Sequence, residues 1–319
     1  MIMRHTREIA VGFAIGGLFL ALVVVSPGFF SRENVVDIVL ANMPVLISAL
    51  GTTLVILSGQ IDISIGSVFA ICGVLAGLIA KSGAPLPIVA LGTCLAGAVA
   101  GALNGALVAY IRIPSIVATL ATMVALRDAL RWATDGAWVQ NLPAGFQWLG
   151  VGQRGYPVLA GLSAFGLYAA FAWGMRNLPV GRAVYATGSN PVAARLAGIH
   201  PRFTTFVVFV LAGGLTAFAA LLNAVRFNQI PSNAGLGLEM KVIAAAVVGG
   251  TAITGGRGTV TGTLLGVVLL GLIGPALTFL GVSATWERAI QGAIILSAVG
   301  AEALRSRPLS HTAAIAAGA

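Results

Sequence analysis

The sequence predicts an all-α, polytopic membrane protein with about ten transmembrane helices. Of the 319 residues, 58% are hydrophobic and only 8% are charged, which is far from the composition of a soluble domain. The apolar residues also form long unbroken runs of the roughly 20 residues that a helix needs to cross a bilayer. Alternating segments of about ten residues, typical of a membrane β-barrel, are not seen.

The apolar runs divide the chain into about ten predicted spans. They lie at residues 9–25, 35–57, 65–80, 86–109, 114–133, 157–175, 204–225, 240–255, 259–279 and 285–303. The first run is too long for the apolar region of a typical signal peptide and lacks a small-residue cleavage site, so we interpret it as a span. The shorter runs at 114–133 and 240–255 have an alternative interpretation as broken or re-entrant segments, which would leave about eight or nine spans.

The distribution of charge predicts which loops face the cytoplasm. The loop at 176–202 carries four arginines and no acidic residue, whereas charges assigned to the outer side often have an acidic neighbour. Because cytoplasmic loops are enriched in Lys and Arg, we place this loop and both termini in the cytoplasm. The outer pairs are Arg32 and Glu33, Arg127 and Asp128, and Glu287 and Arg288.

Residues 188–199, GSNPVAARLAGI, predict a short helix in this loop with its own start and stop signals. Asn190 is a preferred N-cap, and Pro191 takes the first helical position, where its missing N–H costs nothing. Gly198 supplies a left-handed C-terminal cap, and Arg195 in the last turn suits the helix dipole. A short, sharply bounded helix in an otherwise membrane-buried chain indicates a surface that docks a partner protein.

The sequence contains no motif for nucleotide binding or catalysis. No GxxxxGK[ST] pattern occurs, and neither Lys81 nor Lys241 follows such a glycine pattern. The acids are scattered, and the histidines and cysteines lack the spacing of a metal site. We therefore expect no enzymatic activity, metal or cofactor in this chain, and any ATP is bound by another chain. The net charge of +9 comes from residues that flank spans, so we expect a lipid bilayer and no nucleic acid as partner.

A few polar residues interrupt the apolar runs. Asp62, in SGQIDISIGS at 58–67, is costly near the membrane, and it either caps the helix that follows or contacts a solute. Asn104 lies within a span, where it either bonds a neighbouring helix or lines a wet path. We interpret 226–241 as a solvated outer loop, which ends near Glu239 and alternatively guards the mouth of a pathway.

Glycine and alanine fill the predicted spans, as in LAGAVAGA at 95–102. Small residues let helices approach closely in lipid, so tight helix packing explains most of them. The glycines of TGGRGTVTG at 254–262 predict a tight turn that needs positive φ.

Several segments together resemble the permease subunit of bacterial ABC importers of the ribose, rhamnose and furanosyl-autoinducer type, within the branched-chain amino acid and monosaccharide permease superfamily. The resemblance covers about residues 9 to 305 and implies an importer-type permease fold, with a single integral-membrane permease domain over 1–319. It also implies a coupling loop at 176–203 and a cytoplasmic tail at 304–319. The segments are SGQIDISIGSVFAICGVLAGLI, ALNGALVAYIRIPSIVATLATM, RAVYATGSNPVAARLAGI, GLGLEMKVIAAAVVGGTAITGGRGTVTGTLLG and the C-terminal span.

The resemblance implies an assembly of several chains in the bacterial inner membrane. The permease pairs with a second copy or a paralogue, ABC ATPase subunits hold ATP and Mg²⁺ on the cytoplasmic side, and a periplasmic sugar-binding protein delivers the solute. Related permeases often carry Glu before a pair of alanines in the helix that docks on the ATPase; Val192 stands there in this chain, so that salt bridge is not expected. The expected coupling residues are Asn190, Pro191, Ala193, Ala194, Arg195 and Gly198.

The resemblance implies transport of a monosaccharide or a related small polyol, such as rhamnose, ribose or a furanosyl autoinducer. The GLGLEMK segment looks most similar to the rhamnose and autoinducer permeases. Alternatives are a branched-chain amino acid permease, a structural membrane protein, and an ion-coupled secondary transporter, which would need acidic or polar residues in mid-span. The candidate residues for the translocation path or its gate are Gln60, Asp62, Ser64, Asn104 and Glu239.

Overall fold

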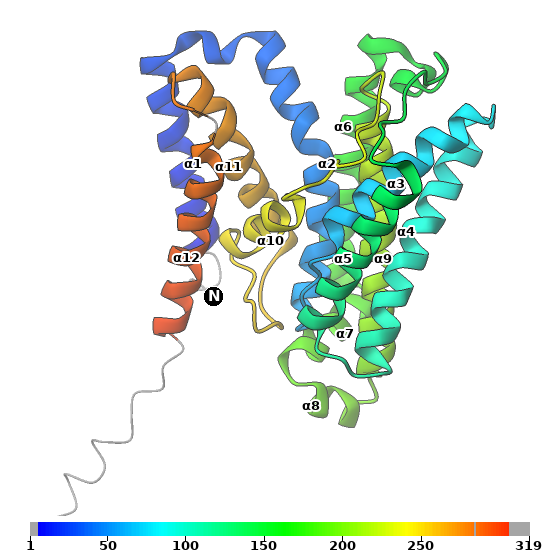
Figure 1. Ribbon diagram of the computed structural model, residues 1–319. Helices are drawn as coiled ribbons and strands as arrows, with labels where there is room; N and C mark the ends of the chain where they lie inside the picture. Colours follow the sequence, from blue (N-terminus) through cyan, green and yellow to red (C-terminus); the bar gives the residue numbers. More distant parts are fainter. Residues whose placement is uncertain (1–5, 284, 306–319) are drawn as a thin grey trace, which may run out of the picture.

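The computed structural model describes residues 6–283 and 285–305, and the regular elements of this part of the chain are all helices. Figure 1 shows α2 near the middle of the molecule, α1, α11 and α12 on one side of it, and α3, α4, α5 and α9 on the other. The predicted tail lies outside the described residues from residue 306 onward. The α-helices are α1 (Thr6–Val25), α2 (Arg32–Leu57), α3 (Ile65–Lys81), α4 (Leu86–Ala109), α5 (Ser115–Thr134), α6 (Gly152–Asn177), α7 (Pro179–Ser189), α8 (Pro191–Leu196), α9 (Pro201–Ala224), α10 (Leu238–Val248), α11 (Val260–Phe279) and α12 (Trp286–Arg305), with short 3₁₀ turns at Pro27–Phe30 and Gln147–Gly150.

Each predicted span corresponds to a helix, and most of the bounds agree within a few residues. Within the described chain, α1, α2, α4, α6, α9 and α11 are long and apolar enough to cross a membrane, and α3 is a shorter apolar helix. The prediction of a full span at 240–255 is wrong. α10 has 11 residues and is about 16 Å long, which is about half the apolar thickness of a bilayer. Glycines from Gly249 onward end it, so the alternative of a broken span is confirmed there.

The helices differ in how much apolar surface they bury inside the molecule. Most of α2, α9 and α11 is buried against other helices, whereas α1, α4 and α6 are largely uncovered. The uncovered faces carry large apolar side chains such as Phe13, Leu95 and Leu162. In a soluble protein such faces would be costly, but a bilayer covers them. The fold therefore has the arrangement of a multi-pass membrane protein.

Glycines bring α4 and α9 into backbone contact. A Cβ atom built at Gly97 would lie 2.4 Å from the carbonyl oxygen of Gly213, and one built at Gly101 would lie 2.2 Å from that of Phe209. These glycines recur every four residues on one side of α4, with Gly105 next in the series, which is the small-residue spacing of close helix pairs in membranes. The tight packing predicted for the 95–102 segment is confirmed.

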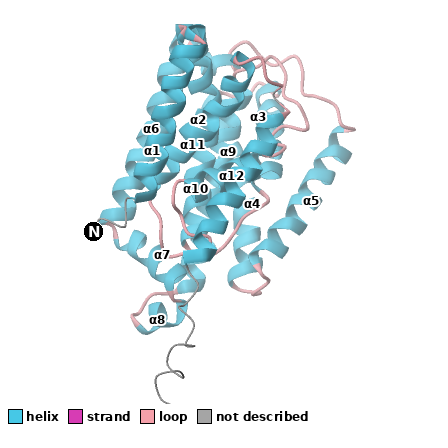
Figure 2. Ribbon diagram, turned by 90° about the vertical axis from the view of Figure 1, so that its left-hand side faces the viewer, coloured by secondary structure: helices cyan, strands magenta, loops and turns pink. Residues whose placement is uncertain are grey.

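The predicted 176–202 loop forms two short helices, α7 and α8. α8 lies at the lower end of the helical body in both views (Figure 1, Figure 2). The predicted start of the short helix is confirmed, because Gly188 and Ser189 complete α7, the chain breaks at Asn190, and α8 begins at Pro191. Asn190 has extended backbone angles (φ −157°, ψ 100°), which end α7 and allow its side chain to cap α8.

Candidate functional site

A buried polar chain lies at the break between α2 and α3. The Oδ1 atom of Asp62 accepts hydrogen bonds from the backbone N–H of Ser64 at 2.8 Å and from its hydroxyl at 2.6 Å. The amide Nδ2 of Asn104, on α4, donates to the Ser64 hydroxyl oxygen at 2.7 Å. All three residues are buried. The structure thus brings together three of the predicted path residues and orders them as donor, relay and carboxylate.

The extended backbone around Asp62 is held by hydroxyl groups of α5. The N–H of Ile61 donates to Ser115 Oγ and the N–H of Ile63 donates to Thr119 Oγ1, both at 3.1 Å. An irregular segment inside a membrane protein needs such partners, because lipid offers none. Gly59 has a φ of +81° and provides the turn out of α2, which glycine allows because it has no Cβ atom.

Asp62 is not itself the cap of α3, so its capping interpretation is wrong, but it has a local structural role next to that cap. It binds Ser64, the N-cap residue of α3, and does not reach further into the first turn of that helix. Gln60 does not join this polar chain. It lines a pocket beside α8 instead.

Glu239 lies at the start of α10 and meets a residue that the sequence analysis did not select, Arg127 of α5. A Cβ atom built at Gly66 would lie 2.1 Å from Glu239 Oε2 and 3.2 Å from Arg127 Nη2, so both side chains reach the same glycine of α3. Arg127 also donates from Nη1 to the carbonyl of Ala234 at 3.0 Å. The signal in the sequence is its position, because Arg127 lies about 18 Å along α5 and inside the apolar run predicted at 114–133.

The segment before α10 is exposed at several residues, as expected for a solvated loop, but part of it packs onto α3. Ile230 is buried against Gly77. It also exchanges two backbone hydrogen bonds with Val139, at 3.0 and 2.9 Å. The close contact is possible because Gly77 has no side chain. The segment then leads to the start of α10, whose first buried residue is Val242.

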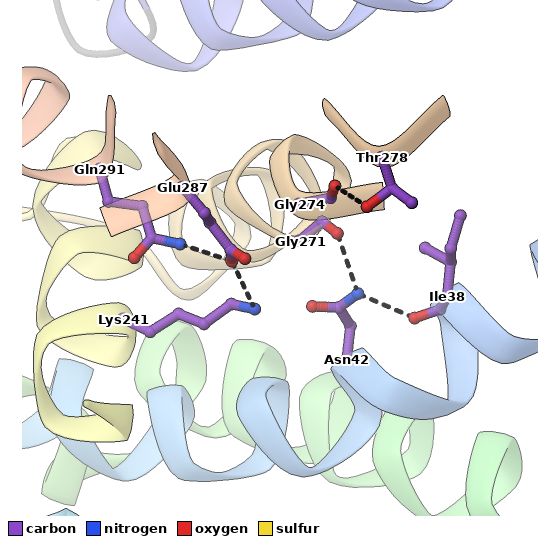
Figure 3. A network of polar contacts seen from close by, with 8 residues as sticks. All are labelled: Ile38, Asn42, Lys241, Gly271, Gly274, Thr278, Glu287 and Gln291. Carbon is purple, nitrogen blue, oxygen red and sulfur yellow. Dashed lines mark hydrogen bonds and ion pairs between the residues drawn. The ribbon is translucent and has the colours of Figure 1, made fainter. Parts of the chain in front are cut away.

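A second polar network joins α10 to α12 and lies near Asn42 of α2 (Figure 3). Lys241 Nζ lies 3.8 Å from Glu287 Oε1, and Gln291 Nε2 donates to the same oxygen at 2.9 Å. Asn42 Nδ2 donates to the carbonyl of Ile38 at 2.8 Å. From the sequence we expected Glu287 to pair with its neighbour Arg288. Its partner Lys241 lies on another helix and cannot be recognised from sequence spacing.

Three buried amide or carboxylate oxygens in the helical body have no hydrogen-bond partner within the described chain. They are Asn42 Oδ1, Asn104 Oδ1 and Glu239 Oε2. A buried acceptor without a donor costs about 1–3 kcal/mol, and two of the three belong to predicted path residues. These atoms are suited to accept hydrogen bonds from hydroxyl groups of a solute.

Directly before α8, three backbone segments meet at what we term the glycine joint, formed by Gly59 after α2, Gly188 in the last turn of α7, and Gly255 and Gly256 of the α10–α11 loop. A Cβ atom built at Gly188 would lie 1.9 Å from the Leu57 carbonyl oxygen, and one built at Gly255 would lie 2.6 Å from Gly59 Cα. Gly255 and Gly256 have φ values of +84° and +71°, which confirms the predicted glycine turn. The joint connects the residues before α8 to the end of α2 and to the α10–α11 loop.

α8 is capped at both ends by the predicted residues. Asn190 Oδ1 accepts hydrogen bonds from the N–H groups of Val192 and Ala193, both at 3.0 Å. Gly198 has a φ of +80°, and the N–H of the following residue returns to the carbonyl of Ala194 at 3.0 Å. These caps fix six residues that have little intrinsic stability as an isolated helix.

The side chains of α8 point in three directions. Ala194 is 3% exposed and packs inward, whereas Val192 and Leu196 are 65% and 87% exposed. Pro191 and Arg195 line a pocket on a further side. The exposed pair lies at i, i+4 spacing and forms one apolar face. Large apolar residues exposed at a helix outside the spans are suited to contact another protein.

Comparison with known proteins agrees with this architecture. Residues 34–299 match the family described as branched-chain amino acid transport system / permease component. The chain is 36% identical to the autoinducer 2 import system permease protein LsrC of Salmonella typhi over 299 residues, which cover 92% of this chain and 85% of that protein. It is 37% identical over 305 residues to the protein of the same name from Escherichia coli strain K12, with 92% and 86% covered. No solved structure matches the chain significantly.

Proposed function

Because the chain belongs to the branched-chain amino acid transport system permease family, we propose that it is the membrane-spanning subunit of an ATP-driven importer. The single observation that carries this proposal is α8, a capped helix with an exposed apolar face, connected through the glycine joint to the broken span at Asp62. In this proposal, Val192 and Leu196 enter a groove on an ATPase subunit. Movement of α8 is then transmitted through backbone contacts to the polar chain.

The transported solute is proposed to be a monosaccharide or a related small polyol. The relatives from Salmonella typhi and Escherichia coli are named for import of autoinducer 2, which supports the sugar-like class. The unpartnered acceptors Asn104 Oδ1 and Glu239 Oε2 also favour it, because a polyol brings several hydroxyl donors. In this proposal Asp62, Ser64, Asn104 and Glu239 belong to the translocation path, and Arg127 orients Glu239.

A branched-chain amino acid remains the alternative solute, since the family description names that class. An uptake assay with both solute classes distinguishes them: competition by ribose or rhamnose, and not by leucine, supports a polyol. Competition by leucine alone would contradict it. A periplasmic binding protein and a second permease copy complete the proposed assembly.

The docking proposal is tested by charge substitutions on the exposed face of α8. Leu196→Glu and Val192→Glu place carboxylates where the side chains are already exposed, so the fold of the chain is expected to survive. We expect the co-expressed ATPase to be lost from the purified complex and uptake to stop. Val151→Glu is the matched control, because Val151 is 51% exposed and precedes α6 at the end of the molecule away from α8. Full ATPase retention by Leu196→Glu would contradict the assignment of α8.

A further inference from the structure

A basic pocket of about 510 Å³ lies beside α8. Its walls come from the end of α2, the end of α4, the α7–α8 junction and the start of α9. A volume of this size is in the range of small-molecule sites, roughly 300–1,000 Å³. The polar side chains that line it include Gln60, Arg112, Thr187, Arg195, Arg202 and Thr205.

The charge of this pocket is one-sided. Arg112, Arg195 and Arg202 all line it, and none of the described residues in its wall is acidic. Within the part of the chain that the structure describes, none of these three guanidinium groups has a hydrogen-bond or ion-pair partner. Each guanidinium carries up to five N–H donors in a planar fork that matches phosphate oxygens. Three such forks around one cavity provide far more donors than the wall can use.

Two further features of the wall favour an anion. Thr187 is 5% exposed, and its hydroxyl is buried without a hydrogen-bond partner among the described residues. The pocket also includes the first residues of α9, a 24-residue helix whose N-cap side chain makes no capping hydrogen bond. Free N–H groups at a helix start favour negative charge. The hydroxyl and the helix start therefore add to the donors of the arginines.

We propose that this pocket binds a phosphate group. The group belongs either to a small phosphorylated solute or to the headgroup of an anionic lipid, since both present the same oxygens. A phosphate held by Arg112, Arg195 and Arg202 would connect the α4–α5 turn, α8 and α9. It would hold α8 against the helical body while Val192 and Leu196, on another side of the helix, stay free for a partner. The proposal does not depend on the solute of the importer.

Arg112 permits a substitution that removes the charge with little risk to the fold. Its backbone has a φ of +67°, a conformation that glycine adopts more readily than any residue with a side chain. Arg112→Gly is therefore expected to unfold at the same temperature as the wild type or at a higher one. A loss of binding in this variant then reports the missing guanidinium and not a damaged fold.

The test is calorimetric titration of inorganic phosphate and of glycerol 3-phosphate into the purified full chain in phosphatidylcholine nanodiscs. We expect saturable binding by the wild type, and a Kd raised about tenfold or more in Arg112→Gly and Arg195→Gln, from the loss of charge-assisted hydrogen bonds. Arg182→Gln is the matched control, since Arg182 is exposed on α7 and does not line the pocket. Unchanged affinity in both pocket variants would overturn the proposal.

A second arm identifies the source of the phosphate. In nanodiscs that contain phosphatidylglycerol, native mass spectrometry is used to count retained lipid on the wild type, Arg112→Gly and Arg182→Gln. If the wild type and Arg182→Gln retain the lipid and Arg112→Gly does not, the phosphate belongs to a lipid headgroup. If the wild type binds soluble phosphate and retains no lipid, the phosphate belongs to a free solute. If neither ligand binds and Arg195→Gln instead loses the ATPase, the pocket is a protein contact and the proposal is wrong.

Discussion

Replacement of Gly188 by alanine adds a single methyl group, but we expect it to disrupt the backbone contacts of the glycine joint. The added methyl group would lie 1.9 Å from the Leu57 carbonyl oxygen and 2.7 Å from the Gly256 nitrogen, where ordinary contacts begin at 3.4 Å. The end of α7 must therefore move about 1.5 Å away from the end of α2. That separation breaks the hydrogen bond from the Gly256 N–H to Leu57 O, which measures 2.9 Å.

The two effects set the expected magnitude. Overpacking costs about 1–3 kcal/mol, and a buried carbonyl that loses its donor costs about 1–3 kcal/mol more. Because the loops can relax in part, we expect Gly188→Ala to lower the free energy of unfolding by about 2–4 kcal/mol. α8 itself is untouched, so the proposed ATPase should still co-purify while uptake is lost.

Reversible unfolding in mixed SDS and detergent micelles measures the change in stability, and ATP-dependent uptake in proteoliposomes measures coupling. Gly161→Ala on α6 is the control, since a Cβ atom built there meets nothing within 4 Å. If Gly188→Ala unfolds like Gly161→Ala and transports normally, the joint is not a rigid contact and the reasoning fails.

Three further substitutions test the packing, the polar chain and the cap. Gly101→Leu, whose Cβ atom would lie 2.2 Å from a backbone oxygen of α9, should prevent stable folding in a thermal melt, while Gly166→Leu on the open face of α6 should be tolerated. Ser64→Ala removes the hydroxyl that links Asn104 to Asp62 and leaves the Asn104 amide without an acceptor, so it should cost about 1–3 kcal/mol and slow uptake; an unchanged melting temperature would contradict these hydrogen bonds. Asn190→Ala should cost about 1 kcal/mol and speed hydrogen exchange over α8, and Asn190→Asp, which keeps the acceptor, should restore protection.

Local features of the fold were predictable from the sequence because they depend on neighbouring residues. Apolar runs located the spans. The residues Asn190, Pro191 and Gly198 located α8, because a capping residue bonds only to the nearest turn of its own helix. The length of α10 was overestimated because Gly249 and Gly250 follow an apolar stretch without a polar boundary. α7 was missed because its residues were assigned to a loop on charge alone.

The features that were not predictable depend on contacts between distant segments. Arg127 stands next to Asp128 in the sequence, and only the fold shows that it reaches Gly66 and Glu239. The glycine joint likewise joins Gly59, Gly188 and the 255–256 turn, whose glycines do not stand out among the 42 in the chain. The periodicity of apolar residues shows which face of a helix is buried, but not which distant segment packs against it, so these contacts were seen only in the structure.

The backbone contact between α4 and α9 has a consequence for how the molecule changes shape. Where two helices touch through side chains, new rotamers allow one helix to slide past the other. Gly97, Gly101 and Gly213 leave no such layer, because backbone atoms already stand at contact distance. We expect α4 and α9 to move as one rigid body through any transport cycle.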